Sequence, residues 1–362
     1  MSKGKIQSGG AAQLVAKTKV ASAIKMKRYG NLYNNIISKE NILLAHERAK
    51  KGKTWQKDVQ KVDSDLDFYI NKLHDQLKSN SYKTSKYKVK TIYEPKKREI
   101  YILPYFPDRI AQQAIMNILE PIWDALFINA SYACRKGKGQ HKGSKVCMKY
   151  VKRNTYCLKC DCSKFYPSIN HDILKIIVRN KIKCRQTLKL LDEIIDSIGG
   201  NTNAPIGNYL SQWFGNLYLN ELDMLIKHKF QIKDYVRYCD DFLLFSNDKK
   251  LLNKMKIIIR DFLASKLKLK MSKCDLFPTT QGVDFLGYRH FPSGCILLRK
   301  STAKRVKRRI KAIPWKVKHG IIKKENAISV IESTKGWMKW ANTHNLSIAI
   351  KLDDIKKEID KY

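Results

Sequence analysis

The chain has 362 residues, 43% of them hydrophobic, which is enough for a packed core divided into two or three subdomains. Its 72 Lys and Arg residues outnumber 32 Asp and Glu residues, giving a formal net charge of +40. A packed protein tolerates such a charge where its working partner is a polyanion, so RNA or DNA is the expected ligand class. No apolar run approaches the roughly 20 residues of a spanning helix, and residues 1–19 lack a signal-peptide core, so no membrane partner is expected.

The cysteines favour a reducing compartment. There are nine, an odd number, and most lie among apolar residues, as expected of buried thiols in a cytoplasmic protein. Cys157, Cys160 and Cys162 have a spacing that invites a zinc interpretation. No second pair or His cluster lies near them, so buried strand residues are the favoured interpretation.

The chain is expected to begin with a basic arm, helices and a hairpin. Residues 1–28 contain no acid, so we expect residues 1–30 to form a basic flexible arm that is mobile or folds on RNA, with a transit peptide as the alternative. Apolar spacing predicts helices over residues 31–50 and 63–77. Alternation predicts strands over residues 87–93 and 98–103. The turn between these strands carries cations that suit solvated charge or a phosphate-gripping finger, namely Lys96, Lys97 and Arg98.

Helix starts and a basic loop are predicted in the next segment. Asp108 is expected to cap a helix, Pro121 to begin the following one, and a further helix to start near Ser168. A basic loop with glycines holds Arg135 and Lys138. These cations suit phosphate contact, although such loops usually serve only as connectors.

Three aspartates lie at the ends of predicted strands. Residues 235–245 predict a hairpin with Asp240 and Asp241 at its tip, because β-branched and aromatic residues favour strands and Asp favours turns. Adjacent carboxylates repel unless a cation lies between them or one is protonated, and for a lone pair an ordinary turn is the simpler explanation. A strand from Tyr156, however, runs into Asp161. Together the three carboxylates would form a two-Mg²⁺ site that activates a 3′ hydroxyl and stabilises a leaving phosphate.

At these residues the chain resembles the reverse transcriptases. Residues 238–241 match their Tyr-x-Asp-Asp box, and Asp161 with Phe165-Tyr166 matches their first aspartate motif. Further blocks follow in the expected order: Lys97-Arg98, Asp108-Arg109, the loop ending in Arg135, Lys273, and residues 285–288. The resemblance covers about residues 31–288 and implies an α+β right-hand polymerase with fingers, a palm of antiparallel sheet plus helices, and a helical thumb. It implies fingers and palm over residues 31–300 and a basic thumb over residues 301–362.

The segment between the aspartate motifs narrows the resemblance. Ile206-Gly207 and Ser211-Gln212 stand where most of these enzymes have Gln-Gly and Ser-Pro. This is similar to the reverse transcriptases of diversity-generating retroelements. That likeness implies error-prone copying of a template-repeat RNA into cDNA, with errors at adenines, in a bacterial or phage cytoplasm. It also implies a small helical oligomeric accessory variability protein as partner. The alternatives are a group II intron, retron or defence-associated reverse transcriptase, and a non-catalytic maturase-like RNA-binding protein that has no need for three aspartates.

The resemblance also implies roles for individual residues. Asp161, Asp240 and Asp241 would be catalytic ligands of two Mg²⁺ ions, with the backbone carbonyl of Cys162 as an added ligand. Lys97 and Arg98 would hold the incoming dNTP through its triphosphate. The rest of the nucleotide site would comprise Phe165, Tyr166 as the residue that excludes a 2′ hydroxyl, Gly207 as the point of close backbone approach, and Ile206 and Gln212 as pocket lining. Cys239 departs from the Met, Ala or Val more usual in the family.

The C-terminal region is strongly basic. Residues 299–324 carry twelve Lys or Arg and no acid, which suits a thumb that tracks the phosphates of an RNA–cDNA duplex, although such runs are usually solvated charge. The nucleic-acid-binding residues expected across the chain are Arg135, Lys138, Lys273, Lys304, Arg305 and Arg308. The tryptophans of this region, Trp315, Trp337 and Trp340, are expected in the thumb core rather than as base-stacking platforms.

Overall fold

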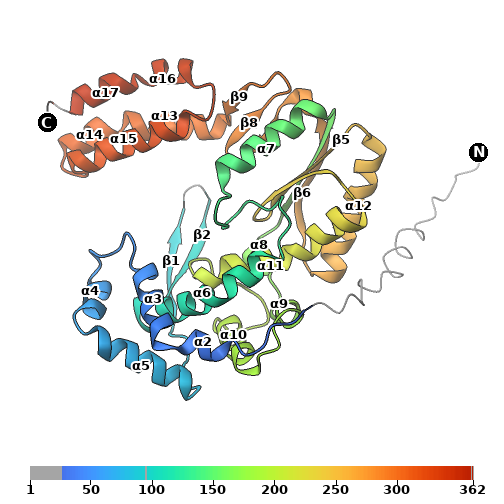
Figure 1. Ribbon diagram of the computed structural model, residues 1–362. Helices are drawn as coiled ribbons and strands as arrows, with labels where there is room; N and C mark the ends of the chain where they lie inside the picture. Colours follow the sequence, from blue (N-terminus) through green and yellow to red (C-terminus); the bar gives the residue numbers. More distant parts are fainter. Residues whose placement is uncertain (1–26, 94–95, 360, 362) are drawn as a thin grey trace, which may run out of the picture. The chain divides into compact units, whose positions relative to one another are not determined.

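The computed structural model describes residues 27–93, 96–359 and 361 (Figure 1). The chain divides into two compact units. Unit 1 comprises the chain up to Arg135, residues 161–231 and residues 254–273. Unit 2 comprises residues 136–160, residues 232–253 and the chain from Cys274 onward. Most of the predicted basic arm, and the start of the predicted turn after residue 93, lie outside the described residues.

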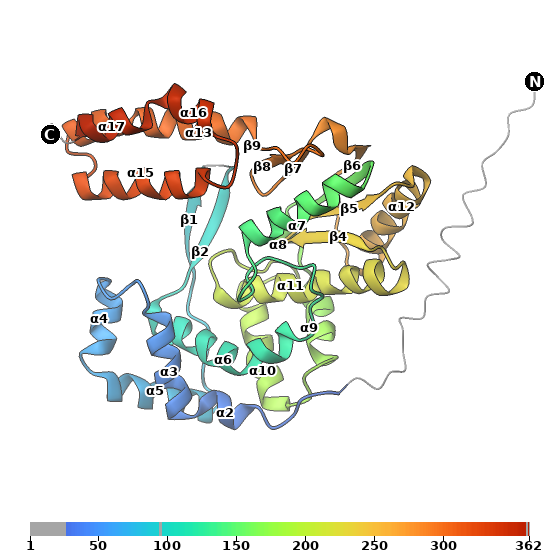
Figure 2. The ribbon, with the colours of Figure 1, turned by 45° about the horizontal axis from the view of Figure 1, so that its top comes forward.

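Unit 1 is mainly helical. Its hairpin pairs β1 (Lys88–Ile92) with β2 (Arg98–Ile102), with Ile92 opposite Arg98, which confirms both predicted strands (Figure 2). The remaining elements are α2 (Tyr33–Ile37), α3 (Lys39–Ala49), α4 (Lys57–Asp63), α5 (Leu66–Lys78), η1 (Tyr105–Arg109), α6 (Ile110–Asp124), α8 (Phe165–Ser168), α9 (His171–Arg179), α10 (Arg185–Asp196), α11 (Tyr209–Met224) and η2 (Leu225–Lys229).

The core of unit 1 is built around α11, which is buried along most of its length. Trp213 on this helix lies near Trp123 of α6 and stacks on Phe127, with ring centroids 6.5 Å and 6.0 Å away. Aromatic side chains bury large apolar areas, so this contact stabilises the helix strongly. The segment that leads into α11 is therefore attached to a rigid element.

Several predicted helix ends in unit 1 are wrong. The helix expected over residues 31–50 is two helices, because Ser38 adopts an extended conformation and caps α3. Asp108 does not act as a helix cap: its buried carboxylate accepts hydrogen bonds from the Tyr82 hydroxyl at 2.9 Å and the Ser85 amide at 3.1 Å. Pro121 lies inside α6 rather than at the start of a new helix.

The helix predicted from Ser168 begins later. The chain forms only the short α8 up to Ser168, and α9 starts at His171. The side chain of Asn170 accepts a hydrogen bond from the amide of Ile173, which is the geometry of a helix N-cap. Asn residues commonly end one element and cap the next in this way.

Unit 2 is organised around a four-stranded sheet with the strand order β4-β5-β3-β6. The strands are β3 (Tyr156–Cys162), β4 (Asp234–Tyr238), β5 (Asp241–Ser246) and β6 (Met271–Pro278). The last residues of β3 and the first of β6 belong to unit 1. A separate sheet has the order β7 (Val283–Phe285), β8 (Tyr288–His290) and β9 (Ile296–Leu298), and helix α7 (Gln140–Arg153) packs on β4 and β8. Helix α12 (Lys249–Lys266) connects β5 to β6, and its residues from Lys254 onward belong to unit 1. The short η3 spans Thr279–Gln281.

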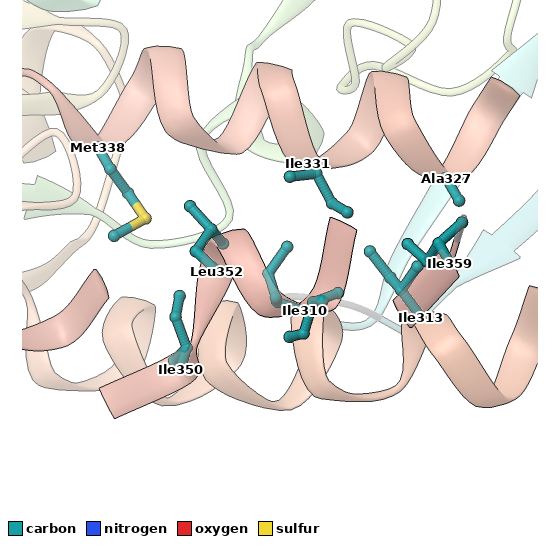
Figure 3. Packing of buried hydrophobic residues seen from close by; sticks show 9 residues of the cluster. Ile310, Ile313, Ala327, Ile331, Met338, Ile350, Leu352 and Ile359 are labelled. Atoms are coloured by element: carbon teal, nitrogen blue, oxygen red, sulfur yellow. The ribbon is translucent and has the colours of Figure 1, made fainter. Parts of the chain in front are cut away.

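A helical bundle ends unit 2 and has its own apolar core (Figure 3). Its helices are α13 (Lys300–Lys311), α14 (Ile313–Lys318), α15 (Lys324–Met338), α16 (His344–Ile350) and α17 (Leu352–Ile359). The core side chains point inward from all of these helices, and they are Ile310, Ile313, Ala327, Ile331, Met338, Ile350, Leu352, Ile355 and Ile359. The predicted helical thumb therefore has a structural counterpart with a continuous core.

The tryptophans of the bundle depart from the core prediction. Trp337 packs against the bundle core, as expected. Trp315 is 57% exposed, and Trp340 lies at the surface, stacked on His141 with ring centroids 4.0 Å apart. Within the described part of the chain, no helix is both long and apolar enough to cross a membrane.

Candidate active site

The two adjacent aspartates lie at the tip of the β4–β5 hairpin, as the sequence predicts. Tyr238 pairs with Asp241 as the last pair of the register, which leaves Cys239 and Asp240 as the turn. Cys239 has a φ of 53°, a left-handed conformation that costs free energy for a residue with a side chain. The turn must therefore be held by its surroundings.

A buried arginine holds this turn. Arg237 is completely buried in β4, and its guanidinium donates a hydrogen bond of 3.1 Å to the carbonyl oxygen of Cys239. A charged donor on a carbonyl is stronger than a neutral one, contributing about 1.5–3 kcal/mol. The strand residues beside the turn are also buried: Val236, Phe242, Leu243 and Leu244. The position of the aspartate pair is thus fixed from within the sheet.

Asp241 has a cation beside it. The ammonium of Lys159, on β3, lies 3.8 Å from Oδ2 of Asp241 and also donates a hydrogen bond to the carbonyl oxygen of Asp284. The lysine side chain is only 15% exposed, so water screens the pair less than at an open surface. Lys159 is therefore positioned to offset part of the negative charge at the hairpin tip.

The three cysteines of β3 are buried, as expected, and so is Cys147 of α7. Cys157 and Cys160 are fully buried, and the Sγ of Cys160 lies 3.3 Å from that of Cys274. Burial raises the pKa of the Cys157 thiol, and burial followed by the charges of Cys157 and Asp241 raises the pKa of the Cys147 thiol. Over the described ranges, no three His, Cys, Asp or Glu side chains gather closely enough to hold a metal ion.

Asp161 lies one residue before the end of β3, where the predicted strand runs into it, and it is contacted by Ser272 of β6. The hydroxyl of Ser272 lies 2.9 Å from Oδ2 of Asp161 and 3.1 Å from its carbonyl oxygen. The amide of Ser163 donates to the carbonyl oxygen of Lys270 at 2.8 Å. Asp161 belongs to unit 1, whereas Asp240 and Asp241 belong to unit 2, so the grouping of the three carboxylates stays a prediction.

The two aromatic residues after Asp161 have different environments. Phe165 is buried and Tyr166 is half-buried, with ring centroids 5.2 Å apart. Both rings lie over Gly215 of α11, where an added Cβ would be 3.1 Å from Phe165 Cε1 and 3.2 Å from Tyr166 Cε1. Phe165 is thus a core residue that supports Tyr166, and its expected place in the nucleotide site stays a prediction.

The loop before α11 is attached to the β1–β2 hairpin. The amide of Tyr101 donates a hydrogen bond of 2.7 Å to the carbonyl oxygen of Ile206. Gly207 has a φ of 123°, and a Cβ there would overlap the carbonyl oxygen of Tyr101. Glycine is therefore required at this position by β2 itself. Gln212 lies exposed on α11, and Ile206 is half-buried.

The basic residues expected to contact nucleic acid or the triphosphate of the incoming nucleotide fall into two groups. Those that are at least partly exposed in the structure are Lys97, Arg98, Lys138, Lys273, Lys304, Arg305 and Arg308. Arg135 differs from them, because its side chain is only 7% exposed. Its guanidinium donates to Asp124 Oδ1 at 2.5 Å and to the carbonyl oxygens of Ile128 and Ser131. These bonds hold the loop that carries Arg135, and its expected role in phosphate contact stays a prediction.

Sequence reasoning missed three residues that support the aspartates. Arg237, Lys159 and Ser272 each touch an aspartate or the turn that carries one. Arg237 and Lys159 are charged residues inside strands that are otherwise mostly apolar, and this is the one feature that could have drawn attention to them. Ser272 has no such feature.

Helical fingers bearing a hairpin, a sheet that presents two adjacent aspartates at a hairpin tip, and a helical thumb define a right-hand polymerase. The model of the family "Reverse transcriptase (RNA-dependent DNA polymerase)" matches residues 94–290, more than half of the chain. The protein belongs to this family, which assigns it the activity of an RNA-directed DNA polymerase.

Curated relatives are similar over different shares of their length. Protein YkfC of Escherichia coli K12 is 25% identical over 267 residues, which is 60% of this chain and 70% of YkfC. The group II intron-encoded protein LtrA of Lactococcus lactis is 25% identical over 167 residues, which is 42% of this chain and 28% of LtrA. A 91 kDa protein in the cob intron of Schizosaccharomyces pombe is 26% identical over 136 residues, 35% of this chain and 17% of that protein.

A solved structure of apo telomerase from Candida tropicalis has a TM-score of 0.47 and 12% sequence identity, over 76% of this chain and 63% of that chain. The likeness is too distant to refine the family assignment.

Proposed function

We propose that this protein is the error-prone reverse transcriptase of a diversity-generating retroelement, which copies a template-repeat RNA into cDNA and misincorporates opposite adenine. The observation that carries the proposal is the loop at Ile206-Gly207. Most reverse transcriptases place a Gln amide where this chain has Ile206, whose side chain can neither donate nor accept a hydrogen bond. The backbone at Ile206 is tied to β2, so an apolar side chain is presented from a fixed position.

The proposed catalytic residues are Asp161, Asp240 and Asp241, with the carbonyl of Cys162 as an added ligand. Their donor set consists of hard oxygens, which Mg²⁺ prefers. Two bound Mg²⁺ ions would activate the 3′ hydroxyl and stabilise the leaving pyrophosphate. Arg237 holds the turn that carries two of the ligands, and Lys159 offsets their charge. These two residues support the assignment because a rigid anionic turn with a nearby cation suits ligation.

The proposed nucleotide-binding residues come from the start of β2, from α8, and from the loop before α11 together with the first turn of α11. Lys97 and Arg98 are exposed at the start of β2, where they can hold a triphosphate. Tyr166 would exclude a 2′ hydroxyl, and its support on Gly215 favours that role because the ring cannot withdraw into α11. Gln212 would line the pocket with Ile206. The thumb residues Lys304, Arg305 and Arg308 would follow the duplex backbone.

The second candidate is a group II intron-type reverse transcriptase. The names of two relatives say that those proteins are encoded in introns. This favours the group II intron-type reverse transcriptase. Ile206-Gly207 and Ser211-Gln212 weigh against it. The genomic neighbourhood discriminates the two: a short accessory gene and a near-identical repeat pair differing at adenines would support the retroelement. An intron RNA around the gene would support the alternative.

Primer extension on an RNA template tests the activity. Wild-type protein with Mg²⁺ and dNTPs should make cDNA, and sequencing should show errors concentrated opposite template adenine. Asp240→Ala should lose at least about a thousandfold in rate, because loss of a metal ligand raises the barrier by several kcal/mol. Asp67→Ala, an exposed acid on α5, is the matched control. Normal extension by Asp240→Ala would refute the polymerase site, and faithful copying of adenine would refute the retroelement assignment.

The proposed partner is tested separately. A small helical accessory protein should be needed for efficient, processive copying of the template-repeat RNA. The +40 charge of the chain supports RNA binding but not the choice of RNA, so the partner would supply that choice. Efficient initiation on the template-repeat RNA by the isolated chain would contradict the partner proposal.

A further inference from the structure

Three consecutive anchors hold the loop before α11 to the rest of unit 1. The carbonyl oxygen of Ile206 accepts from the amide of Tyr101 at 2.7 Å. The amide of Tyr209 donates to Oε1 of Gln112 at 3.1 Å. Between them, Nδ2 of Asn208 donates to the hydroxyl of Tyr87 at 2.8 Å. Only this middle anchor joins two side chains, so only it can be removed by changing either partner.

The hydrogen bonds around Tyr87 have one consistent direction. The hydroxyl of Ser197 donates to the carbonyl oxygen of Ile194 at 2.7 Å, which uses its single proton. The Tyr87 hydroxyl, 2.7 Å from Ser197 Oγ, must then donate to Ser197, and it accepts from Asn208. The relay therefore runs from Asn208 through Tyr87 to Ser197. Asn208 is 4% exposed, so loss of Tyr87 as acceptor leaves a buried amide without that bond.

The relay connects the loop to the hairpin that carries Lys97 and Arg98. Tyr87 directly precedes β1, and its ring packs edge-to-face on that of Tyr101 in β2, with centroids 5.8 Å apart. Tyr101 lies three residues after Arg98 on the same strand and bonds Ile206 through its amide. The strand that would hold the triphosphate and the loop that would meet the base pair are thus one connected body within unit 1.

We propose that Asn208 and Tyr87 are positioning residues for nucleotide selection, which set the place of Ile206 and Gly207 relative to β2. The inference rests on the proposed function, because it takes Ile206 as part of the pocket for the nascent base pair. Neither residue is required to touch the nucleotide. They act by fixing the loop, so they influence nucleotide affinity and error frequency rather than the chemical step.

Single-nucleotide extension with wild type, Asn208→Ala and Tyr87→Phe tests the proposal. Loss of a buried hydrogen bond to a positioned loop should raise KM for the correct dNTP about tenfold, with kcat within about twofold of wild type. Misincorporation per correct insertion should rise with KM. The double variant should resemble either single variant, because both remove the same bond.

Tyr33→Phe is the matched control. It also removes a buried hydroxyl bond in unit 1, from Tyr33 to the carbonyl oxygen of Leu77 at 2.6 Å, but does not touch the loop. It should lower the melting temperature comparably and leave KM unchanged. Tyr87→Phe keeps the ring packing on Tyr101, so it remains informative if Asn208→Ala does not fold.

The outcomes separate this inference from the function on which it rests. If Tyr87→Phe and Asn208→Ala match Tyr33→Phe in KM and error frequency, or if their effects add in the double variant, the positioning role is wrong. Wild-type cDNA with errors at adenine would then still support the proposed function. If wild-type cDNA is faithful but KM rises in both variants, the proposed function fails and the positioning role stands.

Discussion

The hydroxyl of Ser272 lies 2.9 Å from Oδ2 of Asp161, which ties the aspartate at the end of β3 to the start of β6. The same hydroxyl lies 3.1 Å from the carbonyl oxygen of Asp161, so one proton serves two acceptors of a single residue. This arrangement limits rotation of the carboxylate without adding charge. As the metal ligand proposed above, Asp161 would lose little conformational entropy on binding an ion.

Ser272→Ala should therefore weaken metal use without removing a ligand. We expect the Mg²⁺ concentration for half-maximal extension to rise about tenfold, as is typical when an outer partner of a metal ligand is removed. The rate at saturating Mg²⁺ should fall much less. Ser265→Ala, an exposed serine on α12, is the control. An unchanged Mg²⁺ requirement would show that Ser272 serves only to join the strands.

The contact of Gly215 with Tyr166 gives a prediction on sugar selection. Tyr166→Ala should incorporate ribonucleotides more readily, because the ring that would meet a 2′ hydroxyl is gone. Gly215→Ala should also change the ratio of dNTP to rNTP use, since its Cβ would lie 3.2 Å from Tyr166 Cε1 and must displace the ring. Competition between dNTP and rNTP in primer extension measures both.

Gly215→Ala also separates stability from selection. In a helix interior, Ala is more stable than Gly by about 1 kcal/mol. Any loss of stability in Gly215→Ala must therefore come from contact with the rings of Phe165 and Tyr166 and not from the helix itself. Gly336→Ala on α15, where an added Cβ meets nothing within 4 Å, is the control. The Gly336→Ala control should keep wild-type sugar discrimination. If Gly215→Ala and Tyr166→Ala also keep it, another residue excludes the ribose.

A buried histidine predicts how unit 2 responds to acid. His290 is fully buried in β8, with Nε2 2.7 Å from Ser144 Oγ and Nδ1 3.1 Å from the carbonyl oxygen of Val283. Burial lowers its pKa below the ordinary 6.5, although Val283 and the charge of Asp284 act in the opposite direction. The neutral ring is thus the folded form, donating from Nδ1 and accepting at Nε2.

The sign of the pH effect follows from the lowered pKa. Below pH about 6.5 the unfolded chain binds a proton that the folded chain resists, so the free energy of unfolding should fall as the pH drops. His290→Gln offers a non-titrating donor and acceptor and should flatten this dependence between about pH 8 and pH 5. Urea unfolding at several pH values measures it, with the exposed His319→Gln as control. Equal pH dependence in wild type and His290→Gln would contradict the assignment.

The basic face of α13 predicts a salt dependence. Lys304, Arg305 and Arg308 are at least partly exposed, whereas Thr302 and Ile310 on the same helix are buried. If these three cations neutralise phosphates, a triple Ala variant should lower the slope of log K against log salt by about 0.9 for each phosphate that it no longer neutralises on a duplex. Titration of a labelled RNA–DNA duplex at several salt concentrations measures the slope. A uniform loss of affinity with an unchanged slope would indicate that the helix is distorted instead.

Local sequence patterns predicted the strands and turns that carry the aspartates better than they predicted the tertiary contacts of individual residues. Asp240 and Asp241 at a hairpin tip follow from strand formers on both sides of turn formers, and the position of Asp161 near the end of β3 follows from the same rule. The helix cap predicted at Asp108 was wrong, because a capping carboxylate looks the same in sequence as one buried by tertiary contacts. The internal bonds of Arg135 were missed, because a guanidinium that binds Asp124 looks the same in sequence as one that binds a phosphate. Their partners, Tyr82 and Asp124, become identifiable only in the fold.

The structural reason for glycine at position 207 could not be predicted from the sequence either. The family resemblance implies that Gly207 lets the backbone approach a base pair closely. The contact seen in the structure is instead with the carbonyl oxygen of Tyr101 in β2. No periodicity or propensity joins residues so far apart in the chain. The structure thus adds a requirement from the fold itself to one expected from the substrate.

Ile206 gives the prediction that bears most directly on the proposed function. A pocket that checks its substrate through hydrogen bonds rejects misfits strongly, because a wrong substrate leaves buried polar groups unpaired. An apolar pocket discriminates by only about 1–3 kcal/mol per misplaced group, roughly 10- to 200-fold. Ile206 should therefore permit misaligned pairs to react, most often where template pairing has the fewest hydrogen bonds.

Ile206→Gln should lower misincorporation opposite adenine by about tenfold or more, since it restores an amide at a position that β2 already fixes through the Ile206 carbonyl. Sequencing of cDNA from wild type, Ile206→Gln and Ile206→Val measures the error at each template base. Ile206→Val keeps an apolar side chain of nearly the same shape and should retain the adenine errors. If Ile206→Gln copies adenine no more faithfully than wild type, Ile206 is a packing residue beside Pro205 and the source of the errors lies elsewhere.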